Sequence, residues 1–198
     1  MKYSRLSNFG GRRPRTWILV LALLPLGAAC GGTSSPPTTT DRPPPSPQRF
    51  VSAVCTDVLD WKVVIEVRSS SLVEQETSIQ SATAYLKGVL EDTDQMVARV
   101  RAVGAPTAPN GPRLHGDVVH TLAAGRSALL RVQSEVASLV ARGRVALLRE
   151  VELPILSTVE AIESELRNPS IVEVSQATAS DTDCHRLFRR KAPVGIGA

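Results

Sequence analysis

Two histidines and an aspartate lie close together and are the first residues in this chain to suggest metal chemistry. They are His115, Asp117 and His120, and imidazole and carboxylate groups together bind transition metals. On a helix, however, His115 and His120 lie about 140° apart around the axis, so they cannot meet on one ion without a ligand from another helix. The di-iron pattern of helical bundles needs Glu-x-x-His from two helices. We therefore predict no metal site and expect these side chains at solvent-facing helix ends.

Clustered carboxylates suggest acid–base catalysis, which requires burial to separate the pKa values of two acids. Two such clusters occur, Glu91 with Asp92 and Asp94, and Glu160 with Glu163 and Glu165. Both fall among polar residues at helical spacing. We therefore interpret them as parts of a solvated surface.

The remaining candidates for catalysis or cofactor binding are few. His185 follows Cys184 directly, and a Cys–His pair is catalytic only when the thiolate is free and faces the base. Met96 is a conceivable haem ligand, but a single methionine at helical spacing is normally a packing residue. The sequence contains no Gly-x-Ser-x-Gly elbow, Walker loop or Rossmann glycine pattern. We therefore predict a protein without enzymatic activity and without a cofactor.

Cys30 follows a segment with the organisation of a secretory signal peptide. A basic stretch without acids precedes the ten-residue apolar run Trp17–Leu26, and small residues stand before Cys30. The segment Leu26–Cys30 resembles a bacterial lipobox, although the lipobox leucine usually stands three residues before the cysteine and Leu26 stands four before it. The resemblance implies cleavage after residue 29 and a lipid on Cys30. The alternatives are plain secretion or an uncleaved anchor, and the anchor is disfavoured because a spanning helix needs about 20 apolar residues.

Charge and composition divide the rest of the chain into a tether and one domain. Five of the 23 basic residues lie in the acid-free leader, whereas all 19 acidic residues follow it, so the remainder is nearly neutral. A nucleic-acid binder needs a basic face, and we expect none. Residues 30–48 are rich in Pro, Ser and Thr and predict a disordered, extended tether. Residues 49–191 have the size of a single domain, and residues 192–198 predict a disordered tail.

Periodic apolar residues predict four long helices in this domain. They recur every three or four positions over residues 50–67, 72–103, 114–139 and 145–166. Ser69–Ser71 and the Pro- and Gly-rich residues 104–111 mark breaks, and Gly143 is a predicted cap. Trp61–Val67 is β-branched enough for a strand, but no turn separates it from the helix before it. Pro154 predicts a kink near Val151–Pro154.

Helices with this spacing pack at shallow angles. We therefore predict an all-α fold, an up-down four-helix bundle. Ser180 or Asp181 begins a short final helix through Phe188, which forms a C-terminal appendage. Cys55 and Cys184 are an even pair in an exported domain and predict a disulfide that tethers this appendage. In the entropic model, a disulfide that closes such a long loop stabilises the folded state by about 4 to 5 kcal/mol. The alternative is two buried free thiols.

The lipobox, the Gly31-Gly32 start of the tether and an Ala-, Val- and Arg-rich bundle with two cysteines resemble the small lipoproteins of actinobacteria. The resemblance implies a location, the extracytoplasmic face of the cell membrane, and an architecture. Most such proteins have no assigned activity.

Two functions follow as expectations. The first is a membrane-anchored interaction or structural module, which presents a polar face to an envelope protein. That face contains Arg126, Arg131, Arg142 and Arg149. The alternative is a binding protein for a small apolar or amphipathic ligand between the helices, since the small residues Gly125 and Ala128 and the kink at Pro154 favour a void.

Overall fold

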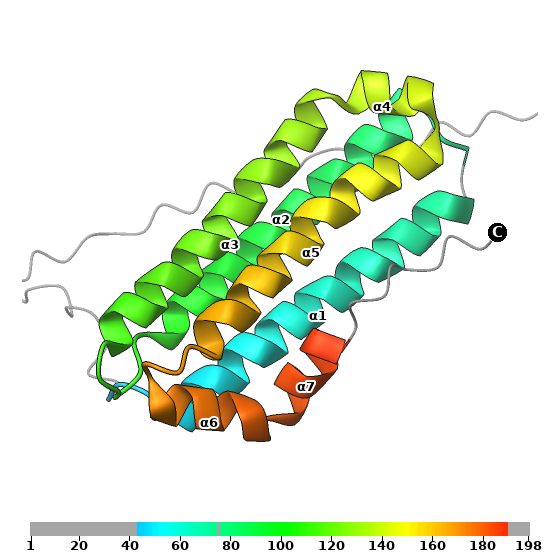
Figure 1. Ribbon diagram of the computed structural model, residues 1–198. Helices are drawn as coiled ribbons and strands as arrows, with labels where there is room; N and C mark the ends of the chain where they lie inside the picture. The colour runs from blue at the N-terminus through cyan, green and yellow to red at the C-terminus, as the bar shows by residue number, and fades with distance from the viewer. Residues whose placement is uncertain (1–42, 75, 190–198) are drawn as a thin grey trace, which may run out of the picture. The chain divides into compact units, whose positions relative to one another are not determined.

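The computed structural model describes residues 43–74 and 76–189, which form seven helices and no strand (Figure 1). The helices are α1 (Pro47–Glu74), α2 (Ile79–Val103), α3 (Gly111–Ser134), α4 (Val136–Arg142), α5 (Arg144–Leu166), α6 (Val172–Ser180) and α7 (Thr182–Arg189). The prediction of an all-α fold is confirmed. The predicted signal peptide, lipidated Cys30 and tail at 192–198 lie outside the described residues, as does most of the tether.

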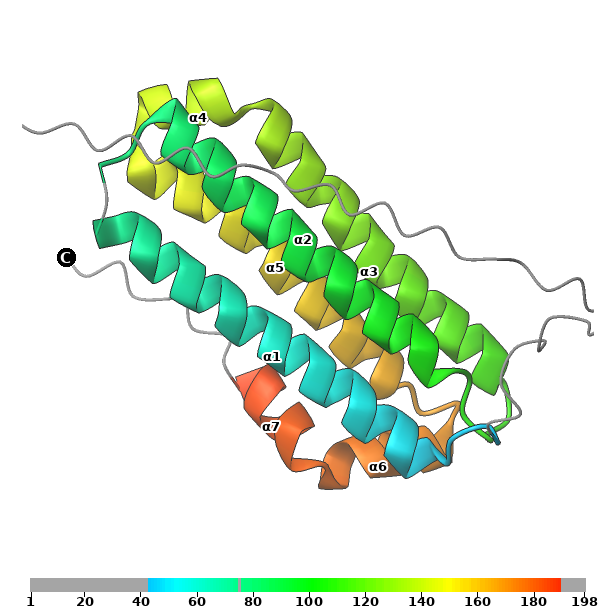
Figure 2. The same cartoon turned by 180° about the vertical axis from the view of Figure 1, so that it is seen from behind.

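The long helices lie side by side and form a helical bundle. Helix α1 packs against α2, α2 against α3, and α3 against α5. The four long helices run along a common direction in both views (Figure 1 and Figure 2). The short helices α6 and α7 both contact α1, and α4 joins α3 to α5. The first two helices are also clamped by the ion pair of Arg99 with Asp57, whose Nε and Oδ1 atoms are 2.6 Å apart.

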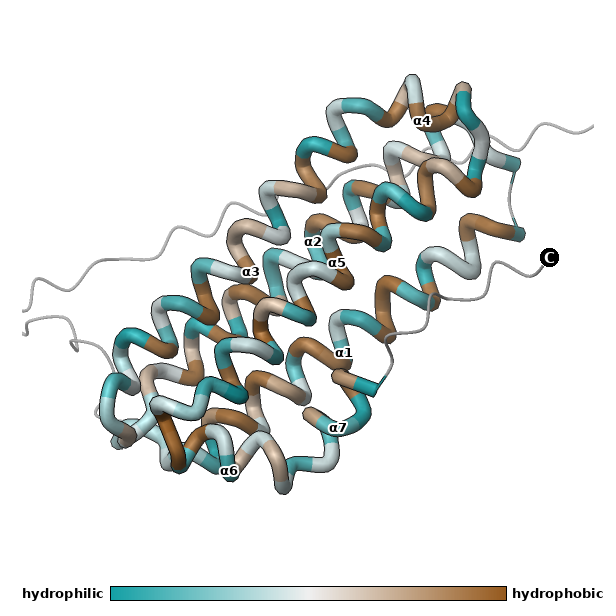
Figure 3. The backbone as a smooth tube through the Cα atoms, in the orientation of Figure 1, coloured by the Kyte–Doolittle hydropathy of each residue, from teal (hydrophilic) through white to brown (hydrophobic). Residues whose placement is uncertain are grey.

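Aliphatic side chains fill the core, as the periodicity predicts. Apolar and polar residues alternate along each long helix (Figure 3). In α1 the predicted stripe is buried in full, since none of its side chains is more than 3% exposed; it consists of Val51, Val54, Val58, Trp61 and Ile65. The indole Nε1 of Trp61 donates a 3.0 Å hydrogen bond to Oγ1 of Thr93 in α2, so the polar side-chain group of this buried stripe has a hydrogen-bond partner.

The predicted break at Ser69–Ser71 is wrong, because α1 continues to Glu74. Each serine hydroxyl donates to the carbonyl four residues earlier, Ser69 to Ile65 at 2.9 Å, with Ser70 and Ser71 bonded in the same way. Serine side chains that bond within the helix do not end it. Leu72 therefore belongs to α1, where it is 3% exposed.

The true start of the second helix is a different serine. Ser78 caps α2 by accepting a hydrogen bond from the amide of Ser81, whose hydroxyl accepts from the amide of Ser78 in return. This reciprocal capping box satisfies two amides that the helix leaves unpaired.

The third predicted helix is divided in two. Helix α3 ends at Ser134 and α4 begins at Val136, with the Glu135 amide bonded to the Val132 carbonyl at 3.1 Å. No glycine or proline marks this break, and the apolar spacing runs through it, so the sequence pattern misses it. Gly143 is confirmed as a cap, since its φ of +99° is favourable only for glycine.

Helix α5 runs from Arg144 to Leu166 through Pro154 without interruption. The predicted kink at Val151–Pro154 stays a prediction. Helix α6 was not predicted, and Thr178 within it explains part of its position. The single hydrogen of the Thr178 hydroxyl is shared between the carbonyl of Val174 at 2.8 Å and that of Leu166, at the end of α5, at 3.1 Å.

Candidate functional site

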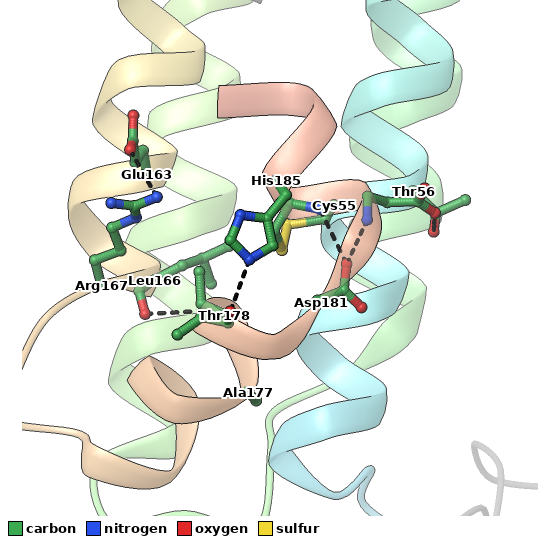
Figure 4. The surroundings of a disulfide bond; sticks show 12 residues. Cys55, Thr56, Glu163, Leu166, Arg167, Ala177, Thr178, Asp181 and His185 are labelled. Atoms are coloured by element: carbon green, nitrogen blue, oxygen red, sulfur yellow. Dashed lines mark hydrogen bonds and ion pairs between the residues drawn. A yellow bond between two sulfur atoms is a disulfide. The ribbon is translucent and has the colours of Figure 1, made fainter. Parts of the chain in front are cut away.

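The disulfide between Cys55 and Cys184 joins α1 to α7 (Figure 4). Both cysteines are fully buried, so the predicted bond is confirmed and the alternative of two free thiols is wrong. Asp181 accepts hydrogen bonds from the amides of Asp183 and Cys184 at 2.9 and 3.0 Å. It therefore caps α7, as predicted, and fixes the turn that presents Cys184 to α1.

Further contacts hold the appendage in place around this bond. The Thr56 hydroxyl in α1 donates to Oδ2 of Asp183 at 2.9 Å. The guanidinium of Arg167 lies 5.4 Å from the centroid of the Phe188 ring, within the range of a cation–π contact. Polar, aromatic and covalent contacts thus act together, and α7 is a fixed part of the domain.

The same bond removes two chemical possibilities. Cys55, Asp181 and Cys184 place potential ligand atoms within 4.8 Å of one another, but a metal binds thiolates, and both sulfurs are in the disulfide. Among the described residues, His185 (Figure 4) has no free thiol beside it either. Its Nε2 lies 2.7 Å from the carbonyl of Ala179 instead.

His115, Asp117 and His120 do not form a group of potential metal ligands among the described residues. His115 lies against Phe50, with the ring centroids 6.2 Å apart and an interplanar angle of 69°. Its Nε2 is buried and has no hydrogen-bond partner among the described residues. His115 and Asp117 are both half-buried and His120 is exposed, so the expectation of solvent-facing side chains is met in full by His120 alone of the three.

The acidic cluster on α2 forms ion pairs between helices. Asp92 and Arg68 make two hydrogen bonds, one of 3.1 Å between Oδ1 and Nη2, and Asp94 pairs in the same way with Arg126 of α3 at 3.0 Å. These hydrogen bonds raise the pKa of Arg68 and of Arg126 above the ordinary value of arginine. These two aspartates therefore connect α2 to its neighbours rather than point freely into solvent.

Two further candidates, Glu163 and Met96, make structural contacts. Glu163 on α5 pairs with Arg167, their closest oxygen and nitrogen being 3.3 Å apart. Met96 is fully buried in the core, where a flexible thioether fills space.

Of the four arginines predicted to form a contact face, one is in an ion pair and three are exposed. Arg126 is engaged by Asp94. The other three are exposed, and none takes part in a salt bridge among the described residues; they are Arg131, Arg142 and Arg149.

Two open grooves lie on the bundle surface. One, of about 590 Å³, lies over α1 and the start of α2 and is lined by Val63, Val64 and Val67, which are 38 to 61% exposed. The sequence pattern does not predict this groove. The sequence feature that could have indicated it is the β-branched run Trp61–Val67, because its three valines lie outside the buried stripe of α1. The other groove, of about 450 Å³, is lined by residues of α3, α4 and α5 and contains Ala128 and Pro154.

Gly125 does not open a void, contrary to expectation. A Cβ atom added there would lie 2.1 Å from Oγ1 of Thr158, so this glycine permits close packing of α3 against α5. The groove begins one helical turn further along α3, at Ala128.

Comparisons of the chain with protein-family models, with curated proteins and with solved structures find no match. Among the described residues, no helix has both the length and the apolar character needed to span a bilayer.

Proposed function

We propose that this chain is a lipoprotein held at the extracytoplasmic face of the cell membrane by a lipid on Cys30, where its helical domain acts as a non-catalytic interaction module of the cell envelope. The observation that carries the proposal is the buried Cys55–Cys184 disulfide. Structural disulfides persist in oxidising compartments and are rare in the cytosol. The lipobox-like segment Leu26–Cys30 would deliver the domain to such a compartment.

The proposed scaffold is an up-down four-helix bundle of α1, α2, α3 and α5 with a tethered appendage of α6 and α7. Its support is the set of contacts between consecutive long helices and the ion pairs that connect them, such as Arg68 with Asp92 and Arg126 with Asp94. A domain fixed by a disulfide and by such pairs presents its surface side chains from a rigid frame.

The proposed contact surface contains the three exposed arginines Arg131, Arg142 and Arg149. Arginine binds carboxylates through two parallel hydrogen bonds and is enriched at protein interfaces. These arginines are not among the salt bridges of the described residues. The matching partner is an envelope protein with an acidic surface.

Crosslinking in intact cells tests this function. The full chain should give a persistent crosslinked protein, and replacing Arg131, Arg142 and Arg149 together by alanine should remove that product. Alanine at Lys87, Arg101 and Arg113, which are also exposed, is the matched control and should leave the product unchanged. A product insensitive to the first set, or no product at all, contradicts the proposal.

A second candidate function is the binding of a small amphipathic ligand. The groove of about 450 Å³ that contains Ala128 and Pro154 favours it, because ligand sites are concave and mostly apolar with a few polar groups.

A further inference from the structure

The groove between α3, α4 and α5 lies where two helices depart from regular hydrogen bonding. On one side α3 stops and α4 starts around Glu135, and on the other side Pro154 interrupts the amide series of α5. Both residues line the groove, whose volume is about 450 Å³. The groove thus lies between two irregular points of the helical backbone.

Apolar groups make up most of its lining. Leu139 is fully buried, whereas Leu153 is 52% exposed. Val132, Ala128 and the Pro154 ring complete the apolar part. An alkyl or aryl group placed here would cover the exposed Leu153 and gain roughly 25 cal/mol for each Å² of apolar surface removed from water.

The polar groups of the groove are mainly acceptors. Glu135 and Glu150 both line it, and neither takes part in the salt bridges among the described residues. Because proline has no N–H, the backbone carbonyl of Glu150 also lacks the donor that a regular helix supplies from four residues ahead. The Ser157 hydroxyl is already donated to the Pro154 carbonyl at 3.1 Å.

One cation, Arg131, stands against these acceptors. Two glutamates and one arginine therefore line the groove, so the charges of its lining sum to a net negative charge. A ligand with a positive charge and N–H donors matches the net negative charge of this lining, whereas an anionic ligand adds a further negative charge.

We propose that this groove binds a small amphipathic amine, with the ammonium group at Glu135, Glu150 and the Glu150 carbonyl and the apolar body over Leu139 and Leu153. The inference rests on the second candidate function. It is independent of the arginine contact surface except at Arg131, which lies at the groove.

Octylamine is the probe, added to the isotope-labelled full chain and followed by amide NMR. Octanol and octanoate are controls of equal chain length with neutral and negative head groups. We expect saturable shifts centred on the groove and an affinity for octylamine about tenfold above that for octanol, as a hydrogen bond between charged groups provides. Octanoate should bind more weakly than either.

Three substitutions and one control variant test which groups of the groove bind the amine. Glu135→Gln and Glu150→Gln should each weaken octylamine binding by about tenfold, while Glu160→Gln, an exposed position on α5 outside the groove, should not. Pro154→Ala supplies the missing N–H to the Glu150 carbonyl. This variant should have a higher melting temperature yet weaker binding, a combination that a purely structural role of Pro154 does not produce.

Several outcomes overturn the proposal. They are octanoate binding as tightly as octylamine, shifts centred elsewhere, no saturable binding, or equal affinity in all variants. Binding of a basic peptide without binding of octylamine also overturns it and assigns the groove to a protein partner. The crosslinking experiment tests the arginine surface and not the groove. A negative result with octylamine therefore does not contradict the proposed interaction with an envelope protein.

Discussion

At the scale of single residues, the groups that suggest chemistry in the sequence are used for structure. Cys184 is bridged and Asp94 binds Arg126, while His115 packs on Phe50. A sequence shows which residues have reactive groups, but their protonation and reactivity depend on the neighbours that folding supplies. Partners such as Arg126, 32 positions from Asp94, are not visible in the local pattern.

Two glycines of α3 should respond in opposite ways to the same substitution. Gly125→Ala places a Cβ 2.1 Å from Oγ1 of Thr158 and should lower the free energy of unfolding by about 1 to 3 kcal/mol through overpacking. Gly116 has nothing within 4 Å of its added Cβ, so Gly116→Ala should raise stability by up to about 1 kcal/mol. Urea denaturation measures both, and equal effects would contradict the close packing at Gly125.

Because of Tyr85, the free energy of unfolding of the domain should fall with rising pH in the alkaline range. Burial raises the pKa of Tyr85 above its ordinary value, although the hydrogen bond with Ser69 lowers it in part. Because the folded state disfavours the phenolate, the stability from this group is complete below pH of about 10 and is lost as pH rises through the folded-state pKa. Tyr85→Phe should therefore lose less stability than the wild type between neutral pH and pH of about 11. Identical pH profiles for the two proteins would refute the effect.

At the scale of elements, much of the fold follows from the sequence, because a period of 3.6 residues is a local property. The four apolar stripes identify the four long helices, and Gly143 and Asp181 are found as caps. The boundaries at Ser69–Ser71 and Glu135 are missed for opposite reasons. The serine hydroxyls donate hydrogen bonds to backbone carbonyls within α1, so the helix continues through them. The break at Glu135, by contrast, has no glycine or proline to mark it.

The grooves are harder to predict than the helices. Val63, Val64 and Val67 are ordinary helix residues by pattern, and their exposure depends on what packs beside α1 in three dimensions. Likewise Pro154 indicates an irregular helix, but only the fold places it opposite Glu135.

The disulfide should set the stability of the C-terminal appendage. Replacing Cys55 and Cys184 together by alanine should lower the free energy of unfolding by about 2 to 5 kcal/mol and should increase hydrogen exchange mainly in α6 and α7. The first two helices keep the ion pair of Arg68 with Asp92, so their exchange should change less. A double variant as stable as the wild type, with unchanged exchange in α7, would show that the bond is not needed to hold the appendage.

At the scale of the whole molecule, we propose an exported, lipid-anchored chain with a disulfide-bonded helical domain. The disulfide and the Cys30 segment are independent observations that favour the same compartment. The proposed functional surfaces are the exposed Arg131, Arg142 and Arg149 and the groove at Pro154. Neither surface requires the domain to open.

Intact-mass analysis of the chain recovered from the membranes of a bacterial host tests the central claim most directly. The account predicts a chain that begins at Cys30, carries the mass of a lipid, and is lighter by the two thiol hydrogens lost in the Cys55–Cys184 bond. Cys30→Ser should abolish the lipid mass and release the chain from the membrane fraction. A chain that begins at Met1, or one without lipid and with two free thiols, would contradict the account.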